Sequence, residues 1–500
     1  MSTFSHHYRA WYITALACMA SFLFAYDTGI IGGILTLPSF ASDFGTKGNT
    51  SVASNSTSLL QAGAFFACFF IYPFTARFGR RWSIVLASFI FCIGAILQVI
   101  NTQSLGVFYA ARVISGIGVG FGTVLTPLFT AEMAPKEIRG KLGSLFQFFF
   151  TLGVMFSYWV DYGVSIHISS KSASQWQIPV GLQLVPGAIL GLGMFLTKES
   201  PRWLAMKRRH EEALASLIWV RGGDRLEVRE EKSFIDTNPT CRFEQILAGI
   251  QEEERVSEGY TRKELWMPVN RWRIVLIIAI QIDAPQVFTA VGAGSNNLFF
   301  SGFFGIAKVV ACGIFVLFLV ERIGRRWALI SGAFAMGACM LIVALIVETH
   351  PPHATGPMAS TSVAAIVMIY LEAMAYNMSW GPVPWLYMAE ILPSRIREPG
   401  VAIGTATQWL FNFVFSQITP YAVKNLGWRA FLMFCIFNWS LVAFAWFFIK
   451  ETRGKALEEM EAVFNNATTA IDIEAINQKV QAGLAANEKS EVSQQENATS

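Results

Sequence analysis

Charged residues inside apolar segments are the positions of this chain that could do chemistry. Asp27 and Arg112 lie about eight and about six residues from the ends of two such segments that we expect on the same side, so at 1.5 Å per residue their depths nearly agree. An isolated charge in hydrocarbon is costly, and such residues pair with each other or mark ion and substrate pathways. We therefore expect Asp27 and Arg112 to contact each other, either as a fixed structural ion pair or as a functional pair.

A second pair follows from the same arithmetic. Lys308 lies about ten residues and Glu372 about nine residues into their segments from that side, which is too deep for the lysine simply to reach the surface. Two interpretations stay open. The residues form a Lys308–Glu372 bridge, or Lys308 supplies positive charge to an anionic substrate.

The stretch "IAIQIDAPQVF" (Ile278–Phe288) places Asp283 and Pro285 in the middle of another apolar segment. Proline removes a helix hydrogen bond, and a carboxylate near a bilayer midplane is unfavourable without a partner. The stretch is therefore a site, a kink or the mark of a missing segment.

The elements that must position these residues are membrane-spanning helices. The chain is 53% hydrophobic and 14% charged with a mean hydropathy of +0.45, which excludes an ordinary soluble globular protein. Its apolar runs are continuous, which favours helices over a β-barrel, and each is long enough to cross about 30 Å of hydrocarbon. Twelve are predicted, at approximately 11–35, 58–75, 83–101, 106–127, 142–163, 180–197, 272–293, 298–320, 327–347, 363–388, 400–423 and 429–449.

Charge placement orients these spans. Outside the spans, Lys and Arg concentrate on the side that carries both termini, whereas the other side holds only Lys47, Lys171, Lys424 and Arg429. This asymmetry predicts that both termini are cytoplasmic. The first apolar segment begins too near Met1 and runs too long for a cleaved signal peptide.

Internal repetition divides the chain into two halves. "RFGRRW" (Arg77–Trp82) returns as "RIGRRW" (Arg322–Trp327), and "EMAPKEIRG" (Glu132–Gly140) returns as "EILPSRIRE" (Glu390–Glu398). "KESPRW" (Lys198–Trp203) is echoed by "KETRGK" (Lys450–Lys455). Motif pairs in one order predict two homologous six-helix bundles. We expect an all-α membrane protein with bundles at 1–197 and 272–455, a cytoplasmic linker with short helices at 198–271, and a polar cytoplasmic tail at 456–500.

These motifs resemble the sugar porter family of the major facilitator superfamily along nearly the whole chain. "FLFAYDTGIIGG", "RVISGIGVGFG", "ESPRWL", "SWGPVPWLYMAEILPSRIREPG" and "KETRGKALEEM" together are specific, and "GIAKVV" and "GTATQWLFNF" resemble fungal members, including quinate permease-like ones. The resemblance implies the major facilitator fold, with twelve transmembrane helices in two pseudo-symmetric bundles. It also implies substrate movement by alternating access between the bundles.

The resemblance further implies an intracellular gate. Arginines and glutamates at the cytoplasmic rim of each half are expected to form networks that hold the outward-facing state and break on opening inward. The gate residues are Arg77, Arg80, Arg81, Glu132, Arg139, Glu199 and Arg202 in the first half, and Glu321, Arg322, Arg325, Arg326, Glu390, Arg397 and Glu451 in the second.

The first of these networks departs from the family pattern. The family has a glycine four residues before an aspartate, which in turn precedes the arginine, whereas "YPFTARFGRR" places Tyr72 and Ala76 at those positions. The second copy keeps its acid as Glu321. The first latch lacks a carboxylate and is predicted to be looser than usual.

Coupling and substrate residues are also implied by the resemblance. Proton symporters of the family carry an Asp and an Arg at positions matching Asp27 and Arg112, which favours proton exchange over a fixed ion pair. Amides bind hydroxyl groups, and indole faces stack on sugar or cyclohexane rings. The expected substrate-binding residues are Gln61, Gln147, Trp385, Trp409, Asn412 and, for an acid such as quinate, Lys308.

The seventh predicted span, 272–293, differs most from the family. "NRWRIVLIIAIQI" runs directly into "DAPQVF", where the family carries Gln-Gln, Gly-x-Asn and Tyr-Tyr, so roughly three helical turns are missing. Asp283 then marks the position at which these residues have been deleted. A gene-model or splicing error explains the deletion better than a remodelled site, and the chain's activity is predicted to be impaired.

The expected function is membrane transport of a sugar or related polyol by alternating access with proton symport. The alternatives are a quinate or cyclic hydroxy-acid permease, or a non-transporting nutrient receptor. The chain shows no nucleophile–base set, metal cluster or nucleotide loop, so an enzyme, a cofactor, a catalytic or metal site and a nucleic-acid partner are not expected. We expect a monomer in the plasma membrane whose partners are its substrate, protons and the lipid bilayer.

Overall fold

The computed structural model describes residues 7–45, 50–100, 103–135, 138–221, 268–281, 297–350, 360–392 and 394–453. Asp283 and Pro285, the tail 456–500 and most of the linker 198–271 lie outside these described residues. All regular secondary structure in the described part is helical, as the continuous apolar runs predict.

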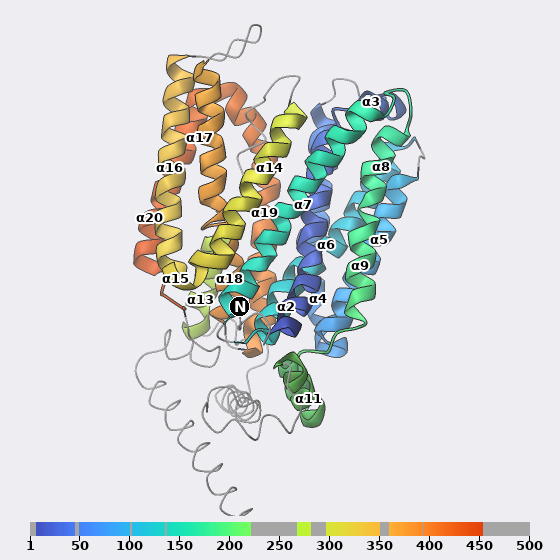
Figure 1. Ribbon diagram of the computed structural model, residues 1–500, viewed down its shortest axis with the longest axis vertical. Helices are drawn as coiled ribbons and strands as arrows, with labels where there is room; N and C mark the ends of the chain where they lie inside the picture. Colours follow the sequence, from blue (N-terminus) through green and yellow to red (C-terminus); the bar gives the residue numbers. More distant parts are fainter. Residues whose placement is uncertain are drawn as a thin grey trace, which may run out of the picture.

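The first half of the chain forms one bundle of long helices, coloured blue to green in Figure 1. Two short helices, α10 and α11, follow it and begin the linker, where short helices were expected. The elements are α2 (Tyr8–Ile34), α3 (Pro38–Asp43), α4 (Thr50–Phe78), α5 (Arg80–Val99), α6 (Leu105–Met133), α7 (Arg139–His167), α8 (Ser174–Leu182), α9 (Leu184–Met194), α10 (Pro201–Met206) and α11 (His210–Arg221).

The second half forms the bundle coloured yellow to red on the other side of the molecule (Figure 1). Its elements are α13 (Pro268–Gln281), α14 (Asn297–Ile314), the π-helical turn η4 (Phe315–Leu319), α15 (Val320–Ile323), α16 (Arg325–Thr349), α17 (Ser360–Asn377), α18 (Pro382–Glu390), α19 (Ser394–Leu426) and α20 (Trp428–Phe448).

The predicted spans correspond to these helices in order. Ten helical segments of the described residues are long and apolar enough to cross a membrane, counting α8–α9, α14–α15 and α17–α18 as one segment each. The predicted spans 272–293 and 400–423 fall on α13 and α19. The described part of α13 is short, and α19 is long but more polar. The order of the described helices therefore agrees with the predicted arrangement of two bundles.

Three predicted spans are not single continuous helices. The span 363–388 breaks between α17 and α18 at "GPVP", where Pro382 and Pro384 lack the N–H groups that a continuous helix would use. Gly381 closes this turn by donating its N–H to the Tyr376 carbonyl oxygen at 2.8 Å. Only Gln183 separates α8 from α9, and α14 continues into α15 through the π-helical turn η4.

The repeated "GRR" turns have the same backbone geometry in both halves. Gly79 before α5 has φ 92° and Gly324 before α16 has φ 83°, a left-handed region that favours glycine. A Cβ at Gly79 would collide with the Glu199 carboxylate, and one at Gly324 with that of Glu451. The structural repeat therefore includes the glycine as well as the charged residues.

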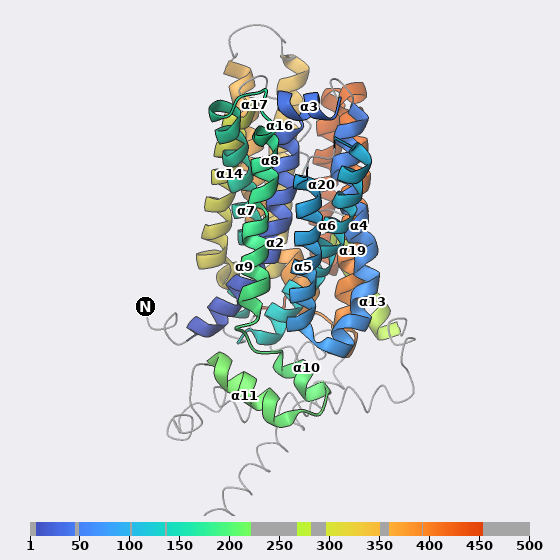
Figure 2. The same ribbon diagram turned by 90° about the vertical axis from the view of Figure 1, so that its right-hand side faces the viewer.

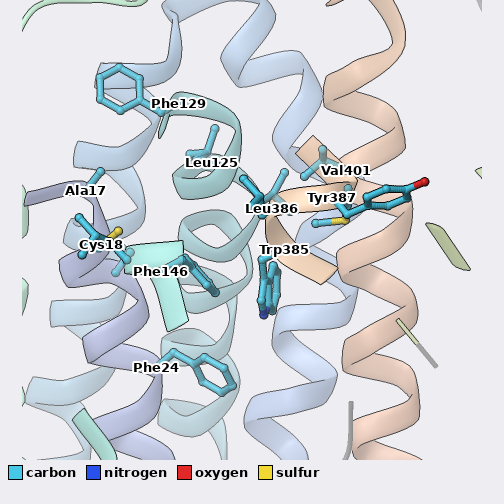
Figure 3. Packing of buried hydrophobic residues seen from close by; sticks show 14 of the residues in the cluster. Ala17, Cys18, Phe24, Leu125, Phe129, Phe146, Trp385, Leu386, Tyr387 and Val401 are labelled. Atoms are coloured by element: carbon cyan, nitrogen blue, oxygen red, sulfur yellow. The ribbon is translucent and has the colours of Figure 1, made fainter. Parts of the chain in front are cut away.

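A continuous apolar core joins the two halves of the molecule. It includes Phe146 of α7 and Trp385 of α18, whose ring centroids lie 4.5 Å apart (Figure 3). Smaller clusters lie within each half, around Trp176 in the first and around Phe304 in the second. The core fixes how the two bundles face each other.

The molecule has two distinct ends along its long axis. We call them the α3 end and the α11 end after the short helices that lie there, and Figure 2 shows the start of α2 close to the α11 end. At the α11 end, a Cβ on Gly143 of α7 would lie 2.5 Å from Leu386 of α18. The two halves are therefore in contact between the middle of the molecule and this end.

Candidate functional site

Asp27 and Arg112 form an ion pair inside the first bundle. Arg112 Nη1 donates to Asp27 Oδ1 at 2.5 Å, and both side chains are buried. Arg112 Nε also donates to the backbone oxygen of Ser56 on α4 at 2.8 Å. The pair thus links α2, α6 and α4, and the contact expected from the depths of the two residues is present.

Gln147 and Trp385 lie where the two halves meet. Gln147 Nε2 on α7 donates to Asn377 Oδ1 on α17 at 2.9 Å, and both residues are buried. Trp385 follows the break after α17 and packs on Phe146, the neighbour of Gln147. An amide pair beside an indole face can bind a hydroxylated ring.

Trp409 and Gln61 also connect the halves. Trp409 Nε1 on α19 donates to Thr123 Oγ1 on α6 at 3.3 Å, and its ring lies 4.6 Å from the Phe24 ring of α2. Gln61 Oε1 on α4 accepts the hydroxyl of Ser416 on α19 at 3.2 Å. Each predicted residue therefore contacts the opposite half of the protein.

The remaining predicted residue of this group, Asn412, is half-buried on α19 less than one turn after Trp409. Three partners were not predicted: Thr123, Asn377 and Ser416. Their signal in the sequence is weak, because each is a small polar residue in an apolar helix. Such residues are common in membrane helices as packing contacts.

Lys308 lies apart from this group of amides and indoles. It is buried on α14, its Nζ lies 4.9 Å from the centroid of the Phe304 ring, and it interacts electrostatically with Glu372 of α17. Both residues belong to the second half. This arrangement favours the Lys308–Glu372 bridge over a lysine reserved for an anionic substrate.

Arg80 is the centre of the charged cluster in the first half. Its Nε lies 3.2 Å from Glu132 Oε2, and Ser200 donates its hydroxyl to the same carboxylate. Glu199 accepts the backbone N–H groups of Arg80, Arg81 and Ser200 at 3.0, 3.1 and 2.8 Å. Burial raises the pKa of the Glu199 carboxyl, and these N–H donors oppose that shift.

Arg325 occupies the equivalent place in the second half. Its Nη2 lies 2.9 Å from Glu390 Oε1, and its Nη1 lies 3.5 Å from Glu321 Oε2. Thr452 donates its hydroxyl to Glu390 at 2.8 Å, as Ser200 does to Glu132. Glu451 accepts the backbone N–H groups of Arg325 and Arg326 at 2.9 and 3.1 Å. The two clusters repeat almost residue for residue.

The first cluster obtains a carboxylate from the opposite half. Arg80 Nη2 lies 3.3 Å from Oε2 of Glu398 on α19, and both side chains are buried. In the second cluster Glu321 and Arg325 also face the opposite half, because a Cβ on Gly140 of α7 would collide with Glu321 and lie 2.7 Å from Arg325 Nη2. Glu398 was not among the predicted gate residues, since its partner lies far away in the sequence.

The other predicted gate residues take different positions. Arg81 and Arg326 donate to the backbone oxygens of Met194 and Trp446 at 3.0 and 2.6 Å. Arg139 and Arg397 are buried and donate to the carbonyl oxygens of Ala134 and Leu392, and Arg202 is buried between the bundle and α11. Arg77 and Arg322 are exposed, and the Arg77 guanidinium lies over the Phe78 ring instead of on a carboxylate.

In the described ranges, no three His, Cys, Asp or Glu side chains gather in a group that could hold a metal ion. The ionisable groups of the site are instead charge pairs between helices.

Known proteins match this chain over almost its whole length. The family model described as "Sugar (and other) transporter" matches residues 13–464. The chain belongs to the sugar porter family of the major facilitator superfamily. Among sugar porters with curated names, it is 34% identical over 479 residues to a probable quinate permease of Aspergillus fumigatus, covering 91% of this chain and 88% of that protein. The quinate permease of Emericella nidulans is 31% identical over 478 residues, covering 92% of this chain and 89% of that protein.

Solved structures of sugar porters have the same fold. The proton:xylose symporter XylE, bound to 6-bromo-6-deoxy-D-glucose, superposes with a TM-score of 0.77 at 26% identity, covering 92% of this chain and 100% of that chain. This sugar porter chain is therefore a membrane transporter by family, and its relatives are named as permeases and symporters, not as enzymes.

Proposed function

We propose that this sugar porter moves a polyhydroxylated ring compound across a membrane by alternating access, coupled to the symport of a proton through Asp27. The observation that carries the proposal is the buried Asp27–Arg112 pair, whose partners come from different helices of one bundle. A carboxylate whose charge depends on a neighbouring arginine changes its proton affinity when that arginine moves. Movement of α6 against α2 would therefore couple proton binding to the conformation of the bundle.

The groups between the halves support a hydroxylated ring as the substrate. Gln61, Gln147, Trp385 and Trp409 bridge the two bundles, so a substrate bound among them would contact both. A sugar fits the indole faces and amides. Quinate is the second candidate, because the relatives that match over about nine-tenths of the chain are named quinate permeases or probable quinate permeases.

We place the α11 end in the cytoplasm, with both termini, and the protein as a monomer in the plasma membrane. The Lys and Arg residues outside the spans support this orientation. The charged clusters around Arg80 and Arg325 then act as an intracellular gate, closed in this structure and opening when the halves separate. The bundles correspond to residues 1–197 and 272–455, with the linker 198–271 between them.

The experiment is uptake in liposomes with an imposed inward proton gradient, by the purified form whose span 272–293 has the roughly three missing helical turns restored, because the 500-residue chain is predicted to be impaired. Radiolabelled hexoses and quinate are offered separately, with and without a protonophore. We expect accumulation of one of them above the external concentration, lost when the gradient is collapsed. Uptake that only equilibrates would indicate a passive carrier, and saturable binding without uptake would indicate a receptor.

A further inference from the structure

Asp161 is a second buried carboxyl group of the first bundle, distinct from Asp27. It lies on α7 with no solvent exposure, and neither of its carboxylate oxygens has a hydrogen-bond partner among the described residues. No ion pair involving Asp161 occurs there either. The coupling mechanism proposed above does not use this residue.

A pair of glycines on α2 forms the space that holds Asp161. Gly29 and Gly33 are one turn apart and face Ser157 and Asp161, which are one turn apart on α7. A Cβ at Gly33 would overlap the Asp161 carboxyl group, and a Cβ at Gly29 would overlap the Ser157 hydroxyl. The carboxyl group therefore rests directly against the α2 backbone, in a space that any larger residue would fill.

The charged and titratable groups around this niche are few. Tyr26 on α2 and Tyr158 on α7 are the described groups on which Asp161 acts electrostatically. Asp27 is on α2 as well, but it is paired with Arg112 of α6. Lys308 of α14 interacts with Glu372, and α8 carries no titratable residue. Glu321 and Arg325 meet α7 at Gly140, which precedes Asp161 by 21 of the 29 residues of this helix. No described cation is therefore placed to neutralise Asp161.

We propose that Asp161 binds a proton in this conformation and is a second proton-binding site of the transporter, independent of the Asp27–Arg112 pair. An ionised carboxylate that is buried without a hydrogen bond or a cation is strongly disfavoured, and the group takes up a proton instead. The carboxylate forms one O–H bond with a proton supplied by the water phase, and breaking that bond returns the proton to water. The inference goes beyond the proposed coupling through Asp27, because the proton at Asp161 can be detected without transport.

Infrared spectroscopy of the full-length protein in lipid tests this site. A protonated carboxyl group gives a carbonyl stretch that is separate from the two bands of an ionised carboxylate. At neutral pH, where a carboxyl group in water is ionised, the spectrum of the wild type minus that of Asp161→Asn should contain one protonated-carboxyl band. A difference that contains only carboxylate bands would overturn the proposal. The same band should survive Asp27→Asn, and its loss in that variant would contradict the independence of the two sites.

Two neighbouring glycines provide a test that keeps Asp161 in the chain. Gly33→Ala places a methyl group in the niche, whereas Gly32→Ala is a matched control because nothing lies within 4 Å of a Cβ at Gly32. We expect Gly33→Ala to shift or remove the protonated-carboxyl band and Gly32→Ala to leave it unchanged. If Asp161→Asn fails to accumulate, this pair decides the question. An equal band in both glycine variants would show that the niche does not hold the proton.

Discussion

At the residue scale, Asp27 has one carboxylate oxygen on Arg112 and another with no hydrogen-bond partner in the described part of the chain. Asp27→Asn keeps the shape of the side chain but removes the charge that proton binding requires. We expect uphill uptake to be abolished while exchange of substrate between the two sides continues. The measurement is accumulation against a gradient beside counterflow in the same vesicles.

The same substitution leaves Arg112 buried without a carboxylate. Removing one partner of a buried pair costs about 3–5 kcal/mol, so the abundance of folded protein should fall as well. Asp43→Asn is a suitable control, since Asp43 lies on α3 and accepts the Trp176 indole N–H at 2.8 Å. Unchanged accumulation in Asp27→Asn would exclude this residue as the proton carrier.

Substitutions of Lys308 and Glu372 distinguish a structural ion pair from a lysine that binds an anionic substrate. If they form a structural bridge, Lys308→Met should lower the stability by up to about 3–5 kcal/mol by leaving the half-buried Glu372 without its cation. The double variant with Glu372→Leu should then restore folding. Thermal unfolding and quinate uptake of the single and double variants are compared.

The opposite pattern would favour an anionic substrate. Selective loss of quinate uptake in Lys308→Met, with normal abundance and no gain from Glu372→Leu, would assign the lysine to the substrate carboxylate. Hexose uptake serves as the internal control, because a neutral sugar does not need this charge.

At the element scale, the seventh predicted span (272–293) is the least family-like part of the chain. The helix α13 packs against α18 and α19, with Gln281 Nε2 3.5 Å from Met388 Sδ, and the deletion position at Asp283 follows outside the described residues. If the missing family motif supplies three to five hydrogen bonds of about 1 kcal/mol each, substrate affinity should be lower by roughly two to four orders of magnitude.

Restoring about three helical turns after Ile282 tests this prediction. Both forms are expressed in a host that lacks hexose and quinate transporters, and surface abundance and uptake are measured. We expect the restored form to gain both. Saturable high-affinity uptake by the 500-residue form would instead indicate that Gln281, Asp283 and Gln286 form a site of their own.

At the scale of the whole molecule, the Arg80–Glu398 contact joins the two halves at the α11 end. Ala76 stands where the family has an aspartate. Glu398, from the opposite half, supplies a carboxylate to the cluster around Arg80. Removing one partner of a buried ion pair costs about 3–5 kcal/mol, so Glu398→Gln should shift the equilibrium toward the open α11 end by roughly 100-fold or more.

The opening is measured as the rate at which a water-soluble thiol reagent modifies a cysteine in place of Leu386, which faces Gly143 across the contact. Glu212→Gln is the matched control, since the Arg209–Glu212 pair is exposed and lies within α11. Equal modification rates in the Glu398 and Glu212 variants would show that the contact does not hold the end closed. Faster modification in Glu398→Gln alone would show that Glu398 holds this end closed.

The sequence by itself determined the class of the molecule, the order of its spans and the pairing of Asp27 with Arg112. Each of these depends on a quantity that is local or additive along the chain: the length of an apolar run, the side on which Lys and Arg gather, and the depth of a charge at a fixed rise per residue. The repeated motifs likewise predicted that Arg80 and Arg325 would occupy equivalent clusters.

Only the tertiary structure decided which helix faces met. The Arg80–Glu398 contact, the Gln147–Asn377 hydrogen bond and the placement of Asp161 against Gly33 join residues from helices whose rotation the spacing of charges does not specify. Membrane helices are apolar on most of their surface, so no contrast between an apolar and a polar face selects one side for the interior. Close packing of small residues such as Gly33 and Gly143 decides instead which side of a helix faces the interior. This packing depends on the neighbouring helix, so it is decided only in the tertiary structure.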